Sequence, residues 1–316
     1  MVKRIIIGTR GSQLALWQAH FVRDALSRQS PETTVDLKTI RTEGDRDTSA
    51  PVAQLSGKGV FIKEIEDALL SREVDIAVHS MKDVPTEIPK GLAIAAVCER
   101  EDVRDALLSR AGKKLAELPS GARIGTSSLR RQALLKHFRS DFEILTLRGN
   151  LNTRVRKLDE GLYDAIVLAR AGLHRLGWSS RITETLSTDI ALPAVAQGAV
   201  GVECRDDDPQ LLQLVGRLNH SPTRSAVESE RTLLRELEGG CQVPIGAWAR
   251  VEEGRFILEA CVMSIDGKIY LRDRIEGRES EASSLGSTLA RRLLQAGADK
   301  ILDAIRRSAA SELPAV

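Results

Sequence analysis

A cysteine stands in a glycine-rich turn late in the sequence, in the stretch EGGCQVP at residues 238–244. An unpaired cysteine is usually a small buried hydrophobic residue, and a turn offers it no core to fill. The preceding residues predict a helix that begins near Ser221 and ends at Gly239 and Gly240, because glycine accepts the left-handed conformation beyond a helix end. The position of Cys241 just past this helix points to a chemical use of its sulfur.

A second stretch combines hydroxyl residues and arginines at the expected start of a helix, TSSLRR at residues 126–131. Helix capping by itself explains Thr126, Ser127 and Ser128. It does not explain Arg130 and Arg131, because positive charge in the first helical turn opposes the helix dipole. Free backbone N–H groups, hydroxyls and guanidinium groups together make an anion pocket, which is the interpretation favoured over a simple cap.

Other arginines also follow predicted strands. Arginine suits planar, bidentate recognition of carboxylate or phosphate, and each charge-assisted bond contributes roughly 1.5–3 kcal/mol before desolvation. Any single one of these arginines is more often a solvated surface residue, but their repeated placement at strand ends indicates a polycarboxylate or polyphosphate ligand. The residues are Arg10 with the neighbouring Ser12, Arg148, Arg154, Arg170 and Arg175.

The stretch DIAVHSMKDVP at residues 75–85 reads as a buried strand followed by a polar turn. A Lys82–Asp83 step before a proline-marked turn is equally common on a protein surface, so a structural and a functional interpretation both stay open. A carboxylate among arginines has a lowered pKa and stays charged. Asp83 could then stabilise a developing cation or exchange a proton with a bound amine.

The polar segment at residues 42–61 predicts a long loop, a lid or a disordered stretch, with Lys58 held between two glycines. His79 has no cysteine or carboxylate at ligand spacing, so no metal site is expected. Neither a Walker motif nor a G-x-G-x-x-G fingerprint occurs, and nucleotide binding has no support.

The composition is that of an ordinary soluble protein of 316 residues, with 42% hydrophobic and 28% charged residues. Aromatic residues make up 3%, which argues against stacking platforms for single-stranded nucleic acid. The formal net charge of +2 means that any anion site must be a local cluster. Four cysteines without a disulfide framework, no signal peptide and no membrane-spanning stretch predict a cytoplasmic protein.

An internal repeat relates two parts of the chain. Residues 7–21 (IGTRGSQLALWQAHF) and 124–138 (IGTSSLRRQALLKHF) share five of fifteen positions, and each predicts a strand, a polar turn and a helix. Each copy later has a strand led by aspartate, at 75–80 and 164–169. Strands alternating with helices predict right-handed βαβ units, a parallel sheet, and two α/β lobes with a cleft at the carboxyl ends of the strands.

The last part of the chain predicts a small α+β domain. The helix after Ser221 carries an apolar stripe interrupted only by Glu230, a hairpin turns at Asp266–Gly267, and a closing helix covers about 282–307. The expected organisation is lobe 1 at 1–98 with 198–216, lobe 2 at 103–193, and a C-terminal domain at 219–316.

Together these motifs resemble those of the porphobilinogen deaminase (hydroxymethylbilane synthase) family. They run in order from residue 8 to residue 247, whereas the stretch after about 250 has no distinctive motif. The resembling segments are GTRGSQLALWQA, SGKGVF, DIAVHSMKDVP, CERED, IGTSSLRRQ, LRGNLNTRV, LPAVAQGAVGVECR, LNH and LEGGCQVPIGA.

The resemblance implies an α/β fold with two lobes like those of type II periplasmic binding proteins and a third domain that bears the cysteine. In that fold the segment at 198–205 re-enters the sheet of the first lobe. The resemblance also implies a dipyrromethane cofactor bound to Cys241 through a thioether. On this primer four porphobilinogen molecules are condensed head to tail with loss of ammonia, and hydrolysis releases hydroxymethylbilane for tetrapyrrole, porphyrin and heme biosynthesis. The acetate and propionate groups of each pyrrole account for the arginines.

Carried over by motif, Asp83 is the main catalytic group and stabilises the azafulvene cation and the pyrrole N–H groups. Lys58 belongs to a flexible loop over the cleft. Ala196 stands where the family commonly has glycine, and Arg170 stands where an uncharged residue is more usual. The expected cofactor-binding residues are Ser80, Lys82, Asp83, Thr126, Ser127, Ser128, Arg130 and Arg131, and the expected substrate-binding residues are Arg10, Ser12, Arg148, Arg154, Arg175 and Gln197.

Two other functions compete with this interpretation. A two-lobed anion-binding protein without catalysis explains the lobes and the arginines but leaves Cys241 and Asp83 without a role. A different transferase with a nucleophilic cysteine needs a base near Cys241, and the local sequence has no histidine. The expected partners are porphobilinogen and the growing polypyrrole chain, with no nucleic acid, membrane or metal, and the protein is expected to be a monomer.

Overall fold

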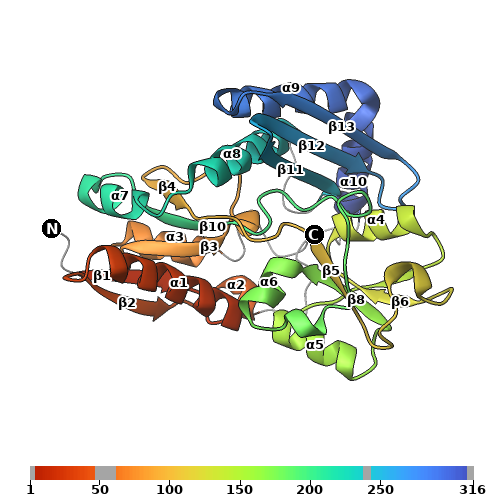
Figure 1. Cartoon of the computed structure of the whole chain (residues 1–316), viewed down its shortest axis with the longest axis horizontal. Coiled ribbons are helices and arrows are strands. Elements are labelled where there is room, and N and C mark those ends of the chain that lie inside the picture. The colour runs from red at the N-terminus through yellow and green to blue at the C-terminus, as the bar shows by residue number, and fades with distance from the viewer. Residues whose placement is uncertain (1–3, 47–61, 238–242, 312–316) are drawn as a thin grey trace. The chain divides into compact units, whose positions relative to one another are not determined.

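The computed structural model describes residues 4–46, 62–237 and 243–311 (Figure 1). Its contacts divide the chain into two compact units. Unit 1 comprises Met1–Glu101 and Gly198–Arg224, and unit 2 comprises Asp102–Gln197 and Ser225–Val316.

Unit 1 is built on a five-stranded sheet in the order β2-β1-β3-β10-β4. β1 pairs in parallel with β2 and β3, whereas β10 is antiparallel to both of its neighbours, β3 and β4. The prediction that 198–205 re-enters the first sheet is confirmed, and the predicted parallel pairing holds for β1 with β2 and β3 but not for β10. The strands are β1 (Arg4–Thr9), β2 (Thr34–Thr39), β3 (Ile76–Ser80), β4 (Leu92–Val97) and β10 (Val200–Arg205).

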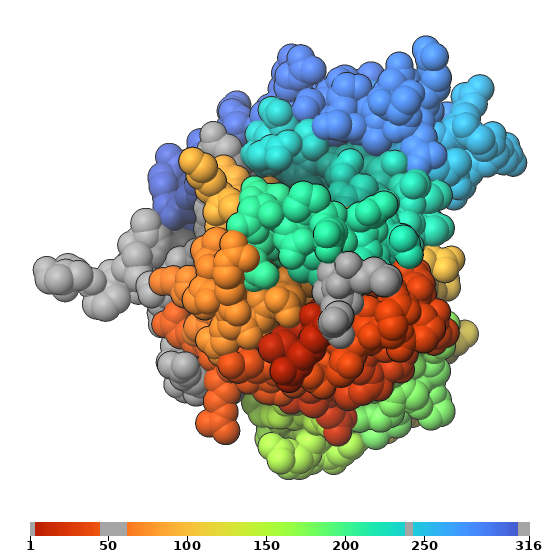
Figure 2. All heavy atoms as spheres, turned by 90° about the vertical axis from the view of Figure 1, so that its left-hand side faces the viewer, coloured from red at the N-terminus to blue at the C-terminus, as the bar shows by residue number. Residues whose placement is uncertain are grey.

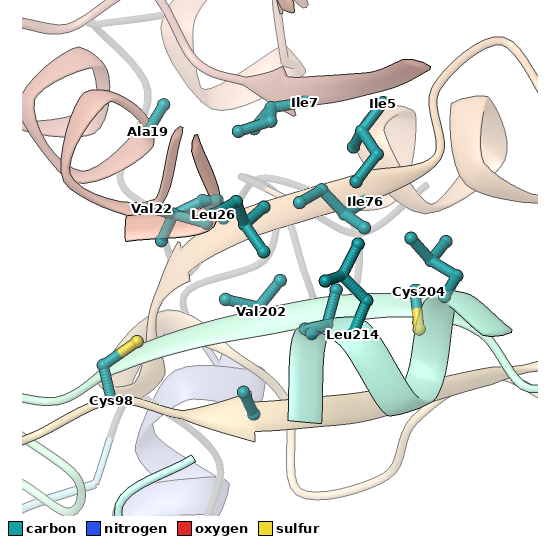
Figure 3. Close-up of a cluster of buried hydrophobic side chains, with 14 of the residues drawn as sticks. Ile5, Ile7, Ala19, Val22, Leu26, Ile76, Cys98, Val202, Cys204 and Leu214 are labelled. Carbon is teal, nitrogen blue, oxygen red and sulfur yellow. The ribbon is translucent and has the colours of Figure 1, made fainter. Parts of the chain in front are cut away.

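Helices cover both faces of this sheet. One face packs against α1 and α7 through Ile5, Ile76 and Val202 (Figure 3). The outer sides of these two helices form part of the unit's surface (Figure 2). The other face packs against α3 through a smaller cluster that includes Ile65 and Ala77. The helices are α1 (Gln13–Gln29), α2 (Glu43–Arg46), α3 (Lys63–Leu70) and α7 (Pro209–Gly216).

Unit 2 contains a second five-stranded sheet with the same pattern, in the order β7-β6-β8-β5-β9. β6 is parallel to β7 and β8, and β5 is antiparallel to β8. The strands are β5 (Asp105–Ser109), β6 (Arg123–Gly125), β7 (Glu143–Leu145), β8 (Ala165–Ala169) and β9 (Glu184–Thr185), and the helices are α4 (Leu129–Phe138), α5 (Leu151–Asp159) and α6 (Arg170–Arg175).

The internal repeat extends to individual hydrogen bonds. Asp75 precedes β3, and its Oδ2 accepts a hydrogen bond from the backbone N–H of Ile6 at 2.8 Å. Asp164 precedes β8, and its Oδ2 accepts one from the N–H of Arg123 at 2.9 Å. Ile6 and Arg123 occupy equivalent positions of the repeat, so the strand-leading aspartates noted in the sequence make the same contact in both sheets.

The remainder of unit 2 holds a three-stranded antiparallel sheet in the order β11-β12-β13. The predicted hairpin at Asp266–Gly267 is confirmed, and Gly267 has a left-handed φ of 73°. The closing helix is present but breaks at Gly297, where φ is 103°. The elements are β11 (Ile245–Glu252), β12 (Arg255–Met263), β13 (Tyr270–Gly277), α9 (Ala282–Leu293) and α10 (Asp299–Ser311), together with α8 (Ser221–Glu236), whose residues from Ser225 onward belong to this unit.

Candidate functional site

In unit 1, expected site residues gather at the carboxyl ends of two neighbouring strands. β1 and β3 are parallel partners, so the residues that follow them leave the sheet at the same edge. Arg10 and Ser12 follow β1, and Ser80 is the last residue of β3. Ser12 caps α1, since its Oγ accepts a hydrogen bond from the N–H of Ala15 at 3.3 Å. The structure therefore brings Arg10, Ser12 and the turn after Ser80 to one edge of the sheet.

The turn that carries Asp83 is a single 3-10 turn, Met81–Asp83, directly after β3. Ser80 Oγ accepts a hydrogen bond from Nε2 of the buried Gln18 at 2.8 Å. The N–H of Met81 donates to the carbonyl of Ala199 at 3.0 Å, and the Met81 side chain is buried. The turn is thus anchored on both sides, and Lys82 and Asp83 are left half-buried.

A glycine on β10 makes room for this turn. A Cβ at Gly201 would collide with Sδ of Met81. Because the site accepts no side chain, Met81 can lie directly against the backbone of β10. Close packing between Met81 and Gly201 therefore sets the height of the turn above the sheet.

In unit 2, the hydroxyl residues of the TSSLRR stretch serve the local fold. Thr126 Oγ1 accepts from the N–H of Ser128 at 3.2 Å, and Ser128 Oγ caps α4 by accepting from the N–H of Arg131 at 3.4 Å. Ser127 Oγ donates to the carbonyl of Leu147 at 2.7 Å. The Ser127 bond holds the residues that follow β6 close to those that follow β7, and the other two bonds shape the start of α4.

The two arginines of this stretch share one buried carboxylate. Arg130 Nη2 donates to Oδ2 of Asp105 at 2.7 Å, and Arg131 Nη2 donates to Oδ1 at 2.8 Å. Asp105 is 0% exposed, Arg130 3% and Arg131 6%. Asp105 opens β5, which runs antiparallel to β8, so it lies at the carboxyl end of β8. Sequence reasoning missed Asp105, although an aspartate directly before the apolar residues ALL, as in the other strand-leading aspartates, was its available signal.

Charge in this cluster is not balanced by Asp105 alone. Burial by itself would raise the pKa of Asp105, but the charges of Arg130 and Arg131 outweigh it and hold that pKa well below its usual range. Two guanidinium groups face one carboxylate, and the Nε atoms of both arginines are buried without a hydrogen-bond partner among the described residues. A donor set of this kind fits a further carboxylate.

Gln197 belongs to the same network. Its Nε2 donates to Oδ1 of Asp105 at 2.9 Å and to the carbonyl of Val103 at 2.7 Å. The preceding Ala196 has a left-handed φ of 59°, which explains why glycine suits this position. Its N–H donates at 2.6 Å to Glu230, the residue that interrupts the apolar stripe of α8.

Three further arginines of unit 2 are half-buried: Arg148 between β7 and α5, Arg154 within α5, and Arg175 at the end of α6. Arg154 Nε donates to the carbonyl of Gly149 at 2.7 Å, which places its side chain against the turn before α5. Arg170, the unusual cation of the sequence, pairs with Asp102 at 3.1 Å. Its charge therefore already has a carboxylate partner within the unit.

Cys241 and Lys58 lie outside the described residues. The other cysteines, Cys98, Cys204 and Cys261, are buried and form no disulfide. Burial raises the pKa of the Cys204 and Cys261 thiols to about 11, so both are protonated at neutral pH. Within the described ranges, no group of three or more His, Cys, Asp and Glu residues is placed to hold a metal ion, and no helix is long and apolar enough to cross a membrane.

Comparison with known proteins gives a consistent result. The family model "Porphobilinogen deaminase, dipyromethane cofactor binding domain" matches residues 5–213, and the model of the family's C-terminal domain matches residues 225–295. A crystal structure of the methionine-binding protein MetQ aligns with 68% of this chain and 89% of its own, at 13% identity and a TM-score of 0.42.

Three relatives are named porphobilinogen deaminase. The protein of Desulforudis audaxviator is 50% identical over 98% of this chain and 100% of its own length. That of Desulforamulus reducens is 48% identical over 97% and 99% of the two chains. That of Pelotomaculum thermopropionicum is 51% identical over 97% and 98%. By full-length identity and by both family models, the chain belongs to the porphobilinogen deaminase family.

Proposed function

We propose that the protein joins four porphobilinogen molecules head to tail and then releases hydroxymethylbilane by adding water. Porphobilinogen deaminase activity, a transferase reaction of tetrapyrrole biosynthesis, follows from the family. The observation that carries the proposal is the match of the family's cofactor-binding domain to residues 5–213. Full-length relatives that are 50% identical to the chain support it.

We assign the attachment of the cofactor to Cys241. A dipyrromethane held there by a thioether supplies the pyrrole carbon to which the first substrate is joined. Support comes from the other cysteines, since Cys98, Cys204 and Cys261 are all buried in the described structure. The excess of guanidinium groups around Asp105 supports the assignment of Arg130 and Arg131 to a carboxylate of the cofactor.

Asp83 acts at the carbon–nitrogen bond that breaks. The protonated amino group leaves the aminomethyl carbon of porphobilinogen as ammonia with the electron pair of the carbon–nitrogen bond, and the carbon becomes an electron-poor cation. That carbon then bonds to the free pyrrole carbon of the growing chain, which loses its proton. A half-buried carboxylate on an anchored turn can stabilise the cation and take part in the proton transfers.

The remaining residues bind the acetate and propionate groups. The support for most of them is their placement after a strand, at the carboxyl edge of its sheet, whereas Arg154 and Arg175 lie on the helices that follow such strands and Gln197 binds Asp105 beside the two arginines. We assign the cofactor carboxylates to Ser80, Lys82, Thr126, Ser127, Ser128, Arg130 and Arg131, and the substrate carboxylates to Arg10, Ser12, Arg148, Arg154, Arg175 and Gln197. We also assign Lys58 to a loop that covers the bound chain, and place the protein in the cytoplasm as a monomer.

The intact mass of the purified protein tests the proposal. Protein from cells with a working tetrapyrrole pathway is expected to be heavier than its sequence by two linked pyrrole units and to give a pyrrole-specific colour. Cys241→Ser should lose both signals, whereas Cys98→Ser, a buried cysteine changed in the same way, should keep both. An unmodified mass for the wild type would leave a two-lobed anion-binding protein as the better description.

A further inference from the structure

Three titratable residues lie between α3 and the sheet of unit 1, next to the strand β3 that leads into the Asp83 turn. Nε2 of His79 on β3 is hydrogen-bonded to Oε2 of Glu203 on β10 at 2.9 Å. His79 is 5% exposed and Glu203 0%. The third member is Glu66 of α3, the helix that packs on β3 and β10.

The alternation of side chains along the strands places all three on one face of the sheet. Ile76, Val78 and Val202 belong to the core on the face covered by α1 and α7 (Figure 3). His79 and Glu203 alternate with these residues and therefore point to the opposite face, under α3. The outer side of α3 is exposed at Lys63, Asp67 and Leu70, so Glu66 is held between solvent and the sheet.

Two carboxylate oxygens in this cluster have no hydrogen-bond donor among the described residues. They are Oε1 of Glu66 and Oε1 of Glu203, and both are buried. A buried, unpaired carboxylate oxygen is unfavourable, whereas a proton on one carboxyl group gives the cluster the donor that it lacks. Burial, and next the charge of Glu203, raise the pKa of Glu66 to about 7, although His79 opposes the shift.

The other charged groups nearby already have partners or lie outside the cluster. Arg205 shares the face of β10 with Glu203, and its Nη1 donates to the carbonyls of Leu69 and Val74 while its Nη2 pairs with Asp75. Its Nε, which has no hydrogen-bond partner among the described residues, lies 3.9 Å from Asp207. Asp67 on α3 is exposed and adds a weak repulsion to Glu66. The strands β1 and β4 contribute apolar residues, such as Ile6 and Leu92, to this face.

The cluster is connected to the catalytic turn through β10. His79 pairs with Gly201 in the sheet, and Gly201 is the residue against which Met81 packs. His79 also directly precedes Ser80, whose strand partner is Val200. A shift of β3 against β10 at His79 would therefore move Met81 and the turn that ends at Asp83.

We propose that Glu66, beside the buried pair of His79 and Glu203, holds a proton at neutral pH and that this cluster positions the Asp83 turn. Glu66 and Glu203 are then positioning residues and do not touch substrate. The catalytic part of this inference rests on the role proposed for Asp83.

Substitution of Glu66→Gln tests whether Glu66 holds a proton, because glutamine mimics the neutral acid and keeps an N–H donor. Asp67→Asn on the same helix is the matched control. The measured quantity is the equilibrium constant of unfolding of the wild type divided by that of Glu66→Gln. As pH rises from 4.5 to about 7, this ratio should increase by up to about tenfold per pH unit, because the unfolded chain loses the Glu66 proton first. The same ratio of unfolding constants, taken for wild type and Asp67→Asn, should stay nearly constant with pH. If the ratio for Glu66→Gln were equally independent of pH, Glu66 would hold no proton.

Hydrogen exchange at the amide of Met81, corrected for its intrinsic rate, tests the positioning role. Exchange should accelerate in the wild type as pH passes through about 7 and should not do so in Glu66→Gln. The kcat ratio of Glu66→Gln to wild type, measured on cofactor-loaded protein, should change over the same range, while the ratio for Asp67→Asn stays constant. If both readouts are independent of pH, the cluster does not position the turn. Exchange requires no turnover, so this result is separate from the mass comparison on Cys241.

Discussion

Arg130 and Asp105 form an ion pair in the interior of unit 2, with Nη2 of the arginine 2.7 Å from Oδ2 of the aspartate and 3% and 0% of the two side chains exposed. The pair shows why the arginines of the TSSLRR stretch are tolerated in the first turn of α4. Asp105 supplies the negative charge that the helix start lacks, and Arg131 and Gln197 bind to the same carboxylate. Three expected ligand-binding residues are therefore oriented by one residue that is not itself expected to touch the ligand.

Removal of that charge should be costly for stability. Asp105→Asn leaves two buried guanidinium groups without a counter-charge, and we expect a loss of about 3–5 kcal/mol in the free energy of unfolding, measured with urea. Asp141→Asn breaks the partly exposed ion pair between Asp141 and Arg139 and should cost less than about 1 kcal/mol. Equal losses for the two variants would contradict the role given to Asp105.

The packing of Met81 against Gly201 should be sensitive to a single methyl group. Gly201→Ala places a Cβ against Sδ of Met81, so we expect about 1–3 kcal/mol of destabilisation and a lower kcat from a displaced Asp83 turn. Gly216→Ala in α7 has no atom within 4 Å of the new Cβ and should be neutral or slightly stabilising. Thermal unfolding and steady-state kinetics of both variants check this, and an unchanged kcat in Gly201→Ala would argue against it.

Asp83 should matter for turnover and little for folding. It is half-buried, so Asp83→Ala is expected to keep the unfolding midpoint of the wild type and to lose at least about 100-fold in kcat. Cofactor-loaded protein should be compared, with loading read from the intact mass. Retained turnover would remove Asp83 from the role proposed for it.

The buried thiols should be inert in the folded protein. Burial raises the pKa of Cys204 and Cys261 to about 11, above the usual value of 9.0, so both stay protonated until strongly alkaline pH. In Cys241→Ser, iodoacetamide at pH 8 should therefore label neither residue before unfolding and both after it, as read by peptide mass. The same shifts remove stability as pH rises from about 9 towards 11, because the unfolded chain loses these protons first.

Local patterns were sufficient for much of the fold and for the family. The repeat at 7–21 and 124–138, the start of α8 at Ser221 and the Asp266–Gly267 hairpin all follow from hydrophobic periodicity and from glycine, proline and hydroxyl residues acting within a few positions. The motif order also identified the family, because long motifs in sequence order require no knowledge of spatial contacts.

Contacts between distant residues were decided by the tertiary structure alone. β10 enters the first sheet antiparallel about 120 residues after β3, and no local signal distinguishes that direction from a parallel one. Asp105 meets Arg130, and Glu66 comes within electrostatic reach of the pair of His79 and Glu203, only because separate strands and helices bring them to one place. A buried charge is stable only beside its partner, and sequence spacing does not reveal which distant residue that partner is.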